Sequence, residues 1–385
     1  GRDQAPDDTG KETLPMNLRI PGPTPVPDSV LKAMAQDMIN HRGPEFSVLM
    51  QRLTAKLKAV FQTENDLFIL TGSGTGAMEA AVVNVLSPGE RVLVAANGFF
   101  GERFADVARA FGADVVPLGF PWGAAVDAAA VDTALARDPA ITTVFVTHNE
   151  TSTGITNDLE AIAGVVKARD RLLVVDAVSS LGAIDLPVDR WGCDVVLTCS
   201  QKAWMVPPGL AFVSVSPRAW EAAKKAKLPR HYWDFAQAKK FLEHHQTPAT
   251  PAVSLMFALD KALDLMEAEG IQNVFRRHER IGEYTRREIV GMGLVLLAAD
   301  VKYASNTVTA ANVPQNINGR ELLRVLRTDY DVVMAPGQGP LAEKIIRVTH
   351  LGYVNEMEME QALRALREAL LRLGFATERL ERAVP

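Results

Sequence analysis

Residues 171–203 read RLLVVDAVSSLGAIDLPVDRWGCDVVLTCSQKA, and this stretch decides the fold class. Two apolar runs, Leu172–Val175 and Val195–Thr198, are too short for helices and rich in β-branched residues, which predicts two buried strands. The first run ends at Asp176, and the second leads into Lys202. A carboxylate and an amine therefore leave the ends of two strands that we expect to be neighbours. Open α/β sheets bind their ligands at such strand ends.

The amine of Lys202 follows a fully apolar strand, so we expect desolvation to lower its pKa and to make it available as a nucleophile. Amines of this kind form Schiff bases with aldehydes, including that of pyridoxal phosphate. This cofactor also needs an acidic partner at its pyridine nitrogen, because the protonated ring is the electron sink, and Asp176 fits that role. On these two residues alone, a lysine at a strand end and an aspartate that caps a turn fit equally well.

The composition limits the classes of function. A chain of 385 residues with 48% hydrophobic and 23% charged residues is typical of a soluble enzyme with one sheet core and a smaller second domain. The net charge of −5 and the lack of a basic cluster give no support for nucleic-acid binding. The two cysteines, Cys193 and Cys199, offer neither a disulfide framework nor metal-ligand spacing, so we expect the cytoplasm. No apolar run approaches roughly 18 residues, so we expect no membrane span.

Short apolar runs alternate with helical segments along most of the chain. Seven strands are predicted, at Leu67–Leu70, Arg91–Ala95, Asp114–Leu118, Thr142–Thr147, Leu172–Val175, Asp194–Thr198 and Leu210–Val215. This alternation predicts an α/β protein with a three-layer, mostly parallel seven-stranded sheet.

The domain organisation follows from where this alternation starts and stops. We expect a flexible arm over residues 1–20, a large domain over 21–265 and a small α+β domain over 266–385. A first helix is expected from about Asp28 to Asp37. Strands of the small domain are expected at Val295–Ala298, Asn306–Asn312, Val332–Met334 and Ile345–Thr349.

A glycine-rich loop, GSGTG over residues 72–76, follows the first predicted strand and opens an alanine-rich helix. Its third glycine comes too early for the dinucleotide pattern G-x-G-x-x-G. A cradle for a single phosphate at the helix N terminus therefore fits better. A plain tight turn between strand and helix is the alternative.

Two further loops follow strand ends. NGFFGER brings Phe99 and Phe100, either of which could stack on a flat ring or belong to the core. HNETSTG, which starts at His148, gathers six polar side chains, but His148 and Glu150 lack a third ligand nearby, so we expect no metal site. The proline-rich PGPTPVP at Pro21–Pro27 is either a linker or an edge of the active-site mouth.

Four motifs, SQKA, DAVSS, HNETSTG and GSGTGAMEAA, resemble in their spacing the class V aminotransferases of the pyridoxal-phosphate fold-type I superfamily. SQKAWMVPPGLAFVSVS is most similar to the alanine–glyoxylate and serine–glyoxylate aminotransferase branch. The resemblance extends from PGPTPVP to about Leu371. It implies an enzyme that uses pyridoxal phosphate to move an amino group from alanine or serine to a 2-oxo acid such as glyoxylate or pyruvate.

The resemblance also implies a role for each matching residue. Lys202 forms the Schiff base with the cofactor, and Asp176 pairs with the pyridine nitrogen. The other implied cofactor contacts are Ser73, Gly74, Thr75 and Gln201 at the phosphate, Phe100 on the ring face and Thr151 at the ring hydroxyl.

On the substrate side, Arg347 lies in a short strand, where a lone arginine usually faces solvent. In the resembled family an arginine in this R-x-x-x-x-G setting binds the substrate carboxylate in bidentate fashion, and Gly22 of the proline-rich segment is assigned to the same side. The segment Gln246–Ser254 resembles a loop that reaches the other subunit's phosphate, which implies a homodimer with shared sites. Thr247 and Thr250 are its candidate contacts, and a stiff linker is the alternative.

Other functions on the same fold make different demands. A cysteine desulfurase needs a mobile cysteine from the second domain, whereas Cys193 and Cys199 both precede Lys202. Pyridoxamine–pyruvate and ureidoglycine–glyoxylate aminotransferases remain alternatives. So does a catalytically silent binding protein, although Lys202, Asp176 and Arg347 together argue against it.

Overall fold

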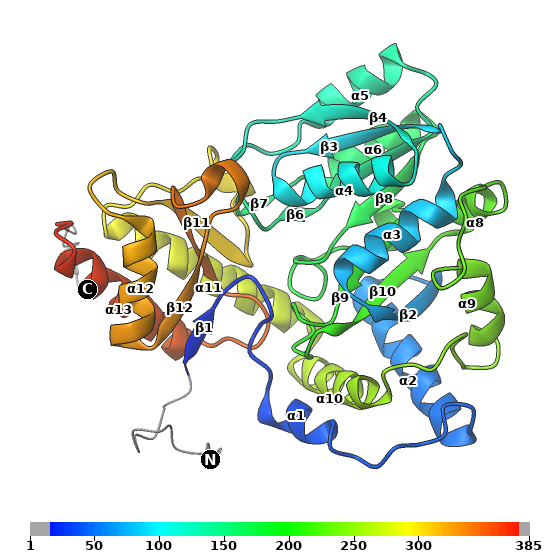
Figure 1. Ribbon diagram of the computed structural model, residues 1–385, viewed down its shortest axis with the longest axis horizontal. Coiled ribbons are helices and arrows are strands. Elements are labelled where there is room, and N and C mark those ends of the chain that lie inside the picture. Colours follow the sequence, from blue (N-terminus) through cyan, green and yellow to red (C-terminus); the bar gives the residue numbers. More distant parts are fainter. Residues whose placement is uncertain (1–15, 377–385) are drawn as a thin grey trace.

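The structure is a computed structural model that describes residues 16–376 (Figure 1). Its large sheet has the strand order β2-β10-β9-β8-β5-β3-β4. The strands are β2 (Asp66–Gly72), β3 (Arg91–Ala96), β4 (Asp114–Gly119), β5 (Thr143–Thr147), β8 (Leu172–Asp176), β9 (Val195–Cys199) and β10 (Gly209–Val215). Every strand except β10 runs in the same direction, since β10 is antiparallel to both of its neighbours. The predicted seven-stranded, mostly parallel sheet is confirmed.

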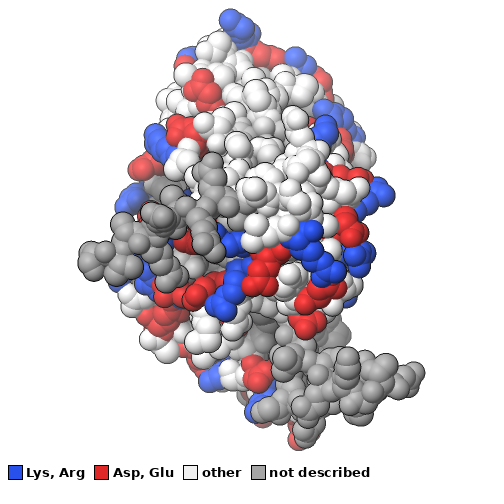
Figure 2. Space-filling view, turned by 90° about the vertical axis from the view of Figure 1, so that its left-hand side faces the viewer, with Lys and Arg blue, Asp and Glu red and all other residues white. Residues whose placement is uncertain are grey.

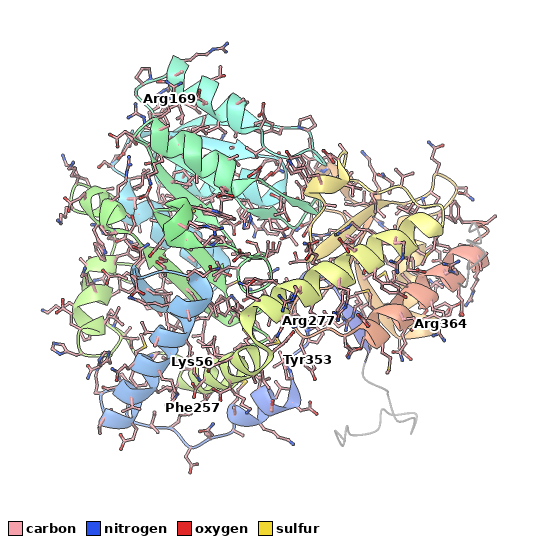
Figure 3. The ribbon with its side chains drawn as sticks, turned by 180° about the vertical axis from the view of Figure 1, so that it is seen from behind. Lys56, Arg169, Phe257, Arg277, Tyr353 and Arg364 are labelled. Atoms are coloured by element: carbon pink, nitrogen blue, oxygen red, sulfur yellow. The ribbon has the colours of Figure 1, made fainter. Side chains whose placement is uncertain are left out.

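Helices cover both faces of this sheet and make three layers (Figures 1 and 3). On one face lie α3 (Gly74–Val85), α4 (Phe99–Ala110), α8 (Pro217–Ala223) and α9 (Phe235–Leu242). On the other lie α2 (Pro44–Phe61), α5 (Ala128–Arg137), α6 (Leu159–Ala168), α7 (Val188–Trp191) and α10 (Val253–Glu269). Along β5, Val144 and Val146 enter one core and Phe145 enters the other. Burial on both faces explains why the strands are continuously apolar.

A second, four-stranded sheet has the order β1-β12-β13-β11 and its own hydrophobic core. Its strands are β1 (Asn17–Arg19), β11 (Val308–Asn312), β12 (Val332–Pro336) and β13 (Ile345–Thr349). The helices of this core are α11 (Ile271–Gly291), α12 (Gly319–Tyr330) and α13 (Glu356–Arg372). The remaining elements are α1 (Asp28–Ala33), the β6 (Asn149–Glu150) and β7 (Ile155–Thr156) hairpin, and the 3-10 turns η1 (Val301–Tyr303) and η2 (Gly339–Leu341).

The structure differs from the prediction at the N-terminal arm. Part of the segment expected to be a flexible arm forms β1, which pairs in parallel with β12 of the second sheet. Asn17 donates a hydrogen bond to the carbonyl of Glu358 at 2.7 Å, and Arg19 is buried. These contacts lie more than 300 residues away in sequence, so local composition could not reveal them. Residues 1–15 of the predicted arm lie outside the described part.

Two further local predictions need correction. The strand expected at Val295–Ala298 is only a single bridge between Leu296 and Ala311, because the chain then turns away and Ala299 bonds to the carbonyl of Gly123 in the large domain. The first helix, α1, ends at Ala33, before the predicted end. The domain boundary at residue 266 stays a prediction.

Two observations bear on whether the described part of the chain could bind a membrane or a nucleic acid. Within residues 16–376 we find no helix with the length and apolarity needed to cross a membrane. On the face in Figure 2, basic and acidic side chains are interspersed, and neither sign gathers into a large patch. That face therefore lacks the basic stripe typical of nucleic-acid-binding surfaces.

Candidate active site

The carboxyl ends of β5, β8 and β9 meet at one edge of the large sheet, where Asp176 pairs with Thr147 on one side and Leu197 on the other. The Asp176 carboxylate is buried and accepts hydrogen bonds from the Val178 N–H at 2.9 Å and from the Thr147 hydroxyl at 3.4 Å. These two bonds offset its burial only in part, and burial raises the pKa of Asp176 to about 7. A cationic partner would restore its charge.

Lys202 lies in the loop after β9, against the proline-rich segment. Its Nζ donates to the carbonyl of Pro21 at 2.6 Å, and its own carbonyl accepts from the Thr24 hydroxyl at 2.9 Å. Gly22 has a φ of +138°, which favours glycine, and a Cβ there would lie 2.8 Å from the Lys202 Nζ and displace the amine. Burial lowers the pKa of Lys202, and the charge of Arg347 acts in the same direction.

The small domain also contacts the backbone of Lys202, which the sequence did not predict. A Cβ at Gly352 would lie 3.0 Å from the Lys202 carbonyl oxygen, so the two backbones are in close contact. Arg277 points from α11 toward the loop of Tyr353 (Figure 3) and donates to the Gly352 carbonyl at 3.1 Å. His278 accepts from the Gly352 N–H at 3.1 Å. The loop that backs the lysine is therefore fixed by α11.

The glycine-rich loop starts α3, with Ser73 as the N-cap that accepts from the Gly76 N–H at 3.3 Å. A Cβ at Gly74 would lie 2.9 Å from Val178 and 3.2 Å from the sulfur of Cys199, so the loop packs directly on the strand ends that carry the site. The first turn of α3 contains no acidic side chain. The positive end of the α3 dipole suits an anion such as phosphate.

Three of the predicted cofactor contacts occupy distinct settings. Gln201, next to Lys202, has a buried amide oxygen with no hydrogen-bond partner. Phe100 lies in the first turn of α4 and meets Phe99 edge-to-face, with ring centroids 5.7 Å apart. The Thr151 hydroxyl bonds to the Ser179 hydroxyl at 2.6 Å, and Ser179 comes from the DAVSS motif. Contact of any of them with a cofactor stays a prediction.

The Glu150 carboxylate caps the N terminus of α4. From the sequence, this residue is considered only as a possible metal ligand. One carboxylate oxygen accepts from the N–H groups of Phe100 and Gly101, both at 3.0 Å. The other accepts from the N–H of Ser152 at 3.0 Å and from its hydroxyl at 2.6 Å. Among residues 16–376 no group of three or more His, Cys, Asp or Glu side chains could hold a metal.

Arg347 is buried in β13, unlike a lone strand arginine that faces solvent. Its Nε donates to the Pro336 carbonyl at 2.9 Å, and its Nη1 donates to the Thr151 carbonyl at 3.2 Å and to the Gln338 Oε1 at 3.0 Å. Burial lowers the pKa of Arg347 to about 10, against the charge of Glu150. The guanidinium therefore stays positive at neutral pH. Its contact with Thr151 brings this small-domain cation to the strand ends of the large sheet.

Thr247 and Thr250 lie beside the carboxyl end of β2 in the loop between α9 and α10. Arg42 donates to the Thr247 carbonyl at 2.6 Å, and the Ala252 N–H bonds to the Thr71 hydroxyl at 3.2 Å. Both threonines line a cavity of about 270 Å³. No described hydrogen bond links them to Lys202 or to the glycine-rich loop, so their role across subunits stays a prediction.

The two cysteines are both buried in the large domain. Burial raises the pKa of the Cys199 thiol to about 12. It also raises the pKa of the Cys193 thiol. Neither thiol has the thiolate character that a cysteine nucleophile requires.

Comparison with known proteins now decides the family, because residues 16–365 match the model of the class V aminotransferases. The chain belongs to this family. It is 46% identical over 362 residues to the small subunit of a soluble hydrogenase from a Synechococcus species, covering 93% of this chain and 94% of that protein. It is 37% identical over 342 residues to L-aspartate–glyoxylate aminotransferase from Paracoccus denitrificans, covering 88% and 86%.

Among solved structures, the alanine–glyoxylate aminotransferase from a Nostoc species superposes with a TM-score of 0.89 at 33% identity. The match covers 94% of this chain and 96% of that structure. Serine–glyoxylate aminotransferases are also among the homologues. This class V chain is therefore an aminotransferase by family, as the sequence motifs predicted.

Proposed function

We propose that this protein uses pyridoxal phosphate to transfer an amino group from a small amino acid, alanine or serine, to a 2-oxo acid such as glyoxylate or pyruvate. The observation that carries the proposal is the meeting of three groups. The amine of Lys202 and the carboxylate of Asp176 leave neighbouring strands β9 and β8, and Arg347 arrives from the second sheet. These are an amine nucleophile, an acidic partner and a carboxylate receptor, the three functions that transamination needs.

The residues present fit the cofactor. Asp176 is buried without a cationic hydrogen-bond partner and gains its charge if a protonated ring nitrogen lies beside it. The N terminus of α3 and the glycines packed on the sheet suit the phosphate. The buried amide oxygen of Gln201, beside Lys202, has no hydrogen-bond partner, which supports a role for this side chain in ligand binding. When bound, pyridoxal phosphate supplies an electron sink that makes the Cα proton of an amino acid acidic.

Lys202 has two tasks in this proposal. Its Nζ would hold the cofactor through the cofactor's aldehyde, and the same amine would take the substrate's Cα proton and return it as a general acid. Its lowered pKa increases the neutral share of the amine, which is the form that accepts a proton. The contacts of Pro21 and Thr24 with the lysine loop keep the amine at the strand ends.

Arg347 would bind the substrate's α-carboxylate. A guanidinium that is itself held by the carbonyls of Pro336 and Thr151 offers a fixed orientation. Two-point binding of a carboxylate then fixes the direction of the Cα–H bond, so that proton transfer to Lys202 needs no further search.

The choice of amino donor is tested by a substrate panel on the cofactor-loaded protein. Alanine, serine and aspartate are offered with glyoxylate or pyruvate, and the visible absorption of the bound cofactor is followed. We expect alanine or serine with glyoxylate to give the highest kcat/KM. The panel includes pyridoxamine with pyruvate, because a pyridoxamine–pyruvate aminotransferase from Mesorhizobium loti superposes with a TM-score of 0.90 at 30% identity. The proposal would be refuted if pyridoxamine were turned over faster than the amino acids, or if none of these donors were turned over.

We also propose a homodimer with shared sites, in the cytoplasm. The shared site is supported by the cavity of about 270 Å³ that Thr247 and Thr250 line. The cytoplasm is supported by the two cysteines, both of which are free. Mixing Lys202→Ala subunits with subunits changed at both threonines tests the sharing. Mixed dimers with one intact site should regain activity, whereas no gain after confirmed subunit exchange would mean that each subunit builds its own site.

A further inference from the structure

The hydrogen bonds of Arg347 leave too few free donors for a carboxylate. A guanidinium has five N–H groups, one on Nε and two on each terminal nitrogen. The Nε–H is taken by Pro336, and the two Nη1 hydrogens are taken by the Thr151 carbonyl and the Gln338 side chain. Of the three Arg347 nitrogens, only Nη2 has no acceptor among residues 16–376. Bidentate binding needs N–H groups on two nitrogens, so one of the three present acceptors has to leave.

Only one of these three acceptors can leave without moving the backbone. Pro336 belongs to β12, and the carbonyl of Thr151 belongs to the loop that Glu150 fixes. Gln338 instead reaches Arg347 with a flexible side chain that is half-buried and makes no other hydrogen bond within the described residues. The movable acceptor is therefore Gln338.

The backbone around Gln338 is held in place. The N–H of Gly337 bonds to the Ile345 carbonyl at 3.2 Å, and a Cβ at Gly337 would lie 2.0 Å from the Leu341 carbonyl oxygen. A Cβ at Gly339 would lie 3.3 Å from Trp122 of the large domain. Only the side chain of Gln338 can exchange its partner while the turn remains seated.

We propose that the Gln338 amide is a displaceable stand-in for the substrate carboxylate on Arg347. In the absence of substrate, its oxygen keeps the buried guanidinium hydrogen-bonded, as a buried cation requires. A substrate carboxylate replaces it because a charge-assisted hydrogen bond is stronger than one to a neutral amide. Gln338 therefore sets the affinity for every carboxylate that enters the site. This inference rests on the proposed function, in which Arg347 is the carboxylate receptor.

The experiment uses the cofactor-loaded protein and acetate, a carboxylate without an amino group. The inhibition constant of acetate and the KM of the amino donor are measured in Gln338→Leu and Gln338→Glu, with Gln51→Leu as a control at an exposed position of α2. Gln338→Leu removes the competing acceptor, so both constants should fall about two- to tenfold. Gln338→Glu places a permanent carboxylate on Arg347, so both should rise more than about tenfold. Gln51→Leu should match wild type.

The direction of change separates this role from a merely structural one. Damage to the turn, or a Gln338 that donates to the substrate, would raise both constants in Gln338→Leu, and either result overturns the proposal. Arg347→Ala separates this failure from failure of the proposed function. If Arg347→Ala retains acetate inhibition, the receptor itself is wrong. If it loses acetate inhibition while Gln338→Leu binds acetate more weakly than wild type, Arg347 stands and only the role of Gln338 falls.

Discussion

Two buried carboxylates, Glu150 and Asp176, follow neighbouring strands and illustrate how the same group serves different ends. Glu150 accepts four hydrogen bonds. Two come from N–H groups at the start of α4, and two come from Ser152, which lies two residues after Glu150. Asp176 accepts two, one of them long at 3.4 Å. Burial raises the pKa of both groups. Glu150 is satisfied within the protein, whereas Asp176 has acceptor capacity left for a ligand.

The difference shows that burial by itself does not mark a functional carboxylate. Glu150 fixes Phe100 and Gly101 at the N terminus of α4, where its charge also favours the helix. The nearby negative charge of Glu150 further raises the pKa of Asp176. A cationic ring beside Asp176 would offset both its burial and this repulsion. The charge of Glu150 thus increases the benefit of placing a cation beside Asp176.

The largest expected loss of turnover comes from changing Lys202, and it should exceed the loss from changing either carboxylate. Lys202→Ala should lose at least about 10³-fold in turnover, because the acid–base group and the nucleophile are lost together. It should still bind the cofactor through the phosphate and ring contacts. Turnover and visible absorption are measured beside Lys227→Ala, a change at an exposed lysine. Undiminished turnover in Lys202→Ala would remove the lysine from the mechanism.

The next effect separates the two carboxylates directly. Asp176→Asn should lower turnover by about 10²-fold, because a neutral amide cannot hold the ring nitrogen protonated. Glu150→Gln should lower turnover far less, since Glu150 acts on α4 and not on the reacting atoms. Single-turnover rates with saturating cofactor measure both. Equal losses in the two variants would mean that Asp176 and Glu150 do not differ in role.

A third effect is the pH dependence of the cofactor-free protein. The folded pKa of Asp176, about 7, lies above its ordinary 3.8, so its contribution to stability is complete below pH 3.8 and is lost as the pH rises through 7. Asp176→Asn lacks this loss. The free energy of unfolding of Asp176→Asn, relative to that of wild type, should therefore be about 3 kcal/mol higher at about pH 8 than at about pH 5. Urea unfolding at both pH values measures this gain, and parallel behaviour of the two proteins would contradict a raised pKa.

The smallest effect concerns the stability of α4. In Glu150→Gln, the amide nitrogen would face N–H donors, so one side of the cap is lost. The free energy of unfolding should fall by about 1–3 kcal/mol. The control Glu102→Gln changes an exposed acid in the first turn of the same helix and should have a smaller effect. If both variants unfold alike, Glu150 is not the anchor of α4.

Much of the fold was predictable because the large sheet is buried on both faces. Runs such as Leu172–Val175 are apolar at every position and have no helical alternative of that length. The place of β1 in the second sheet was not predictable, because Asn17 bonds to Glu358, which is far away in the sequence. The segment Val295–Ala298 has strand-like composition, but its tertiary contacts allow only one bridge.

The candidate site shows a similar division. Lys202 and Asp176 were predictable because each follows a buried strand. The supports Arg277 and Gly352 were not, because they reach the lysine from another domain. Gln338 was missed as well, since a glutamine in a glycine-rich turn has no distinctive pattern. Its only signal is its contact with Arg347.

Attachment of the cofactor to Lys202 can be tested directly by chemical reduction. The cofactor-loaded protein is treated with borohydride, which turns a reversible carbon–nitrogen bond into a stable one, and its peptides are then mapped by mass spectrometry. We predict the added cofactor mass on the peptide that contains Lys202, with loss of the visible absorption band. A label on another lysine, or cofactor that binds and leaves no label, would contradict it.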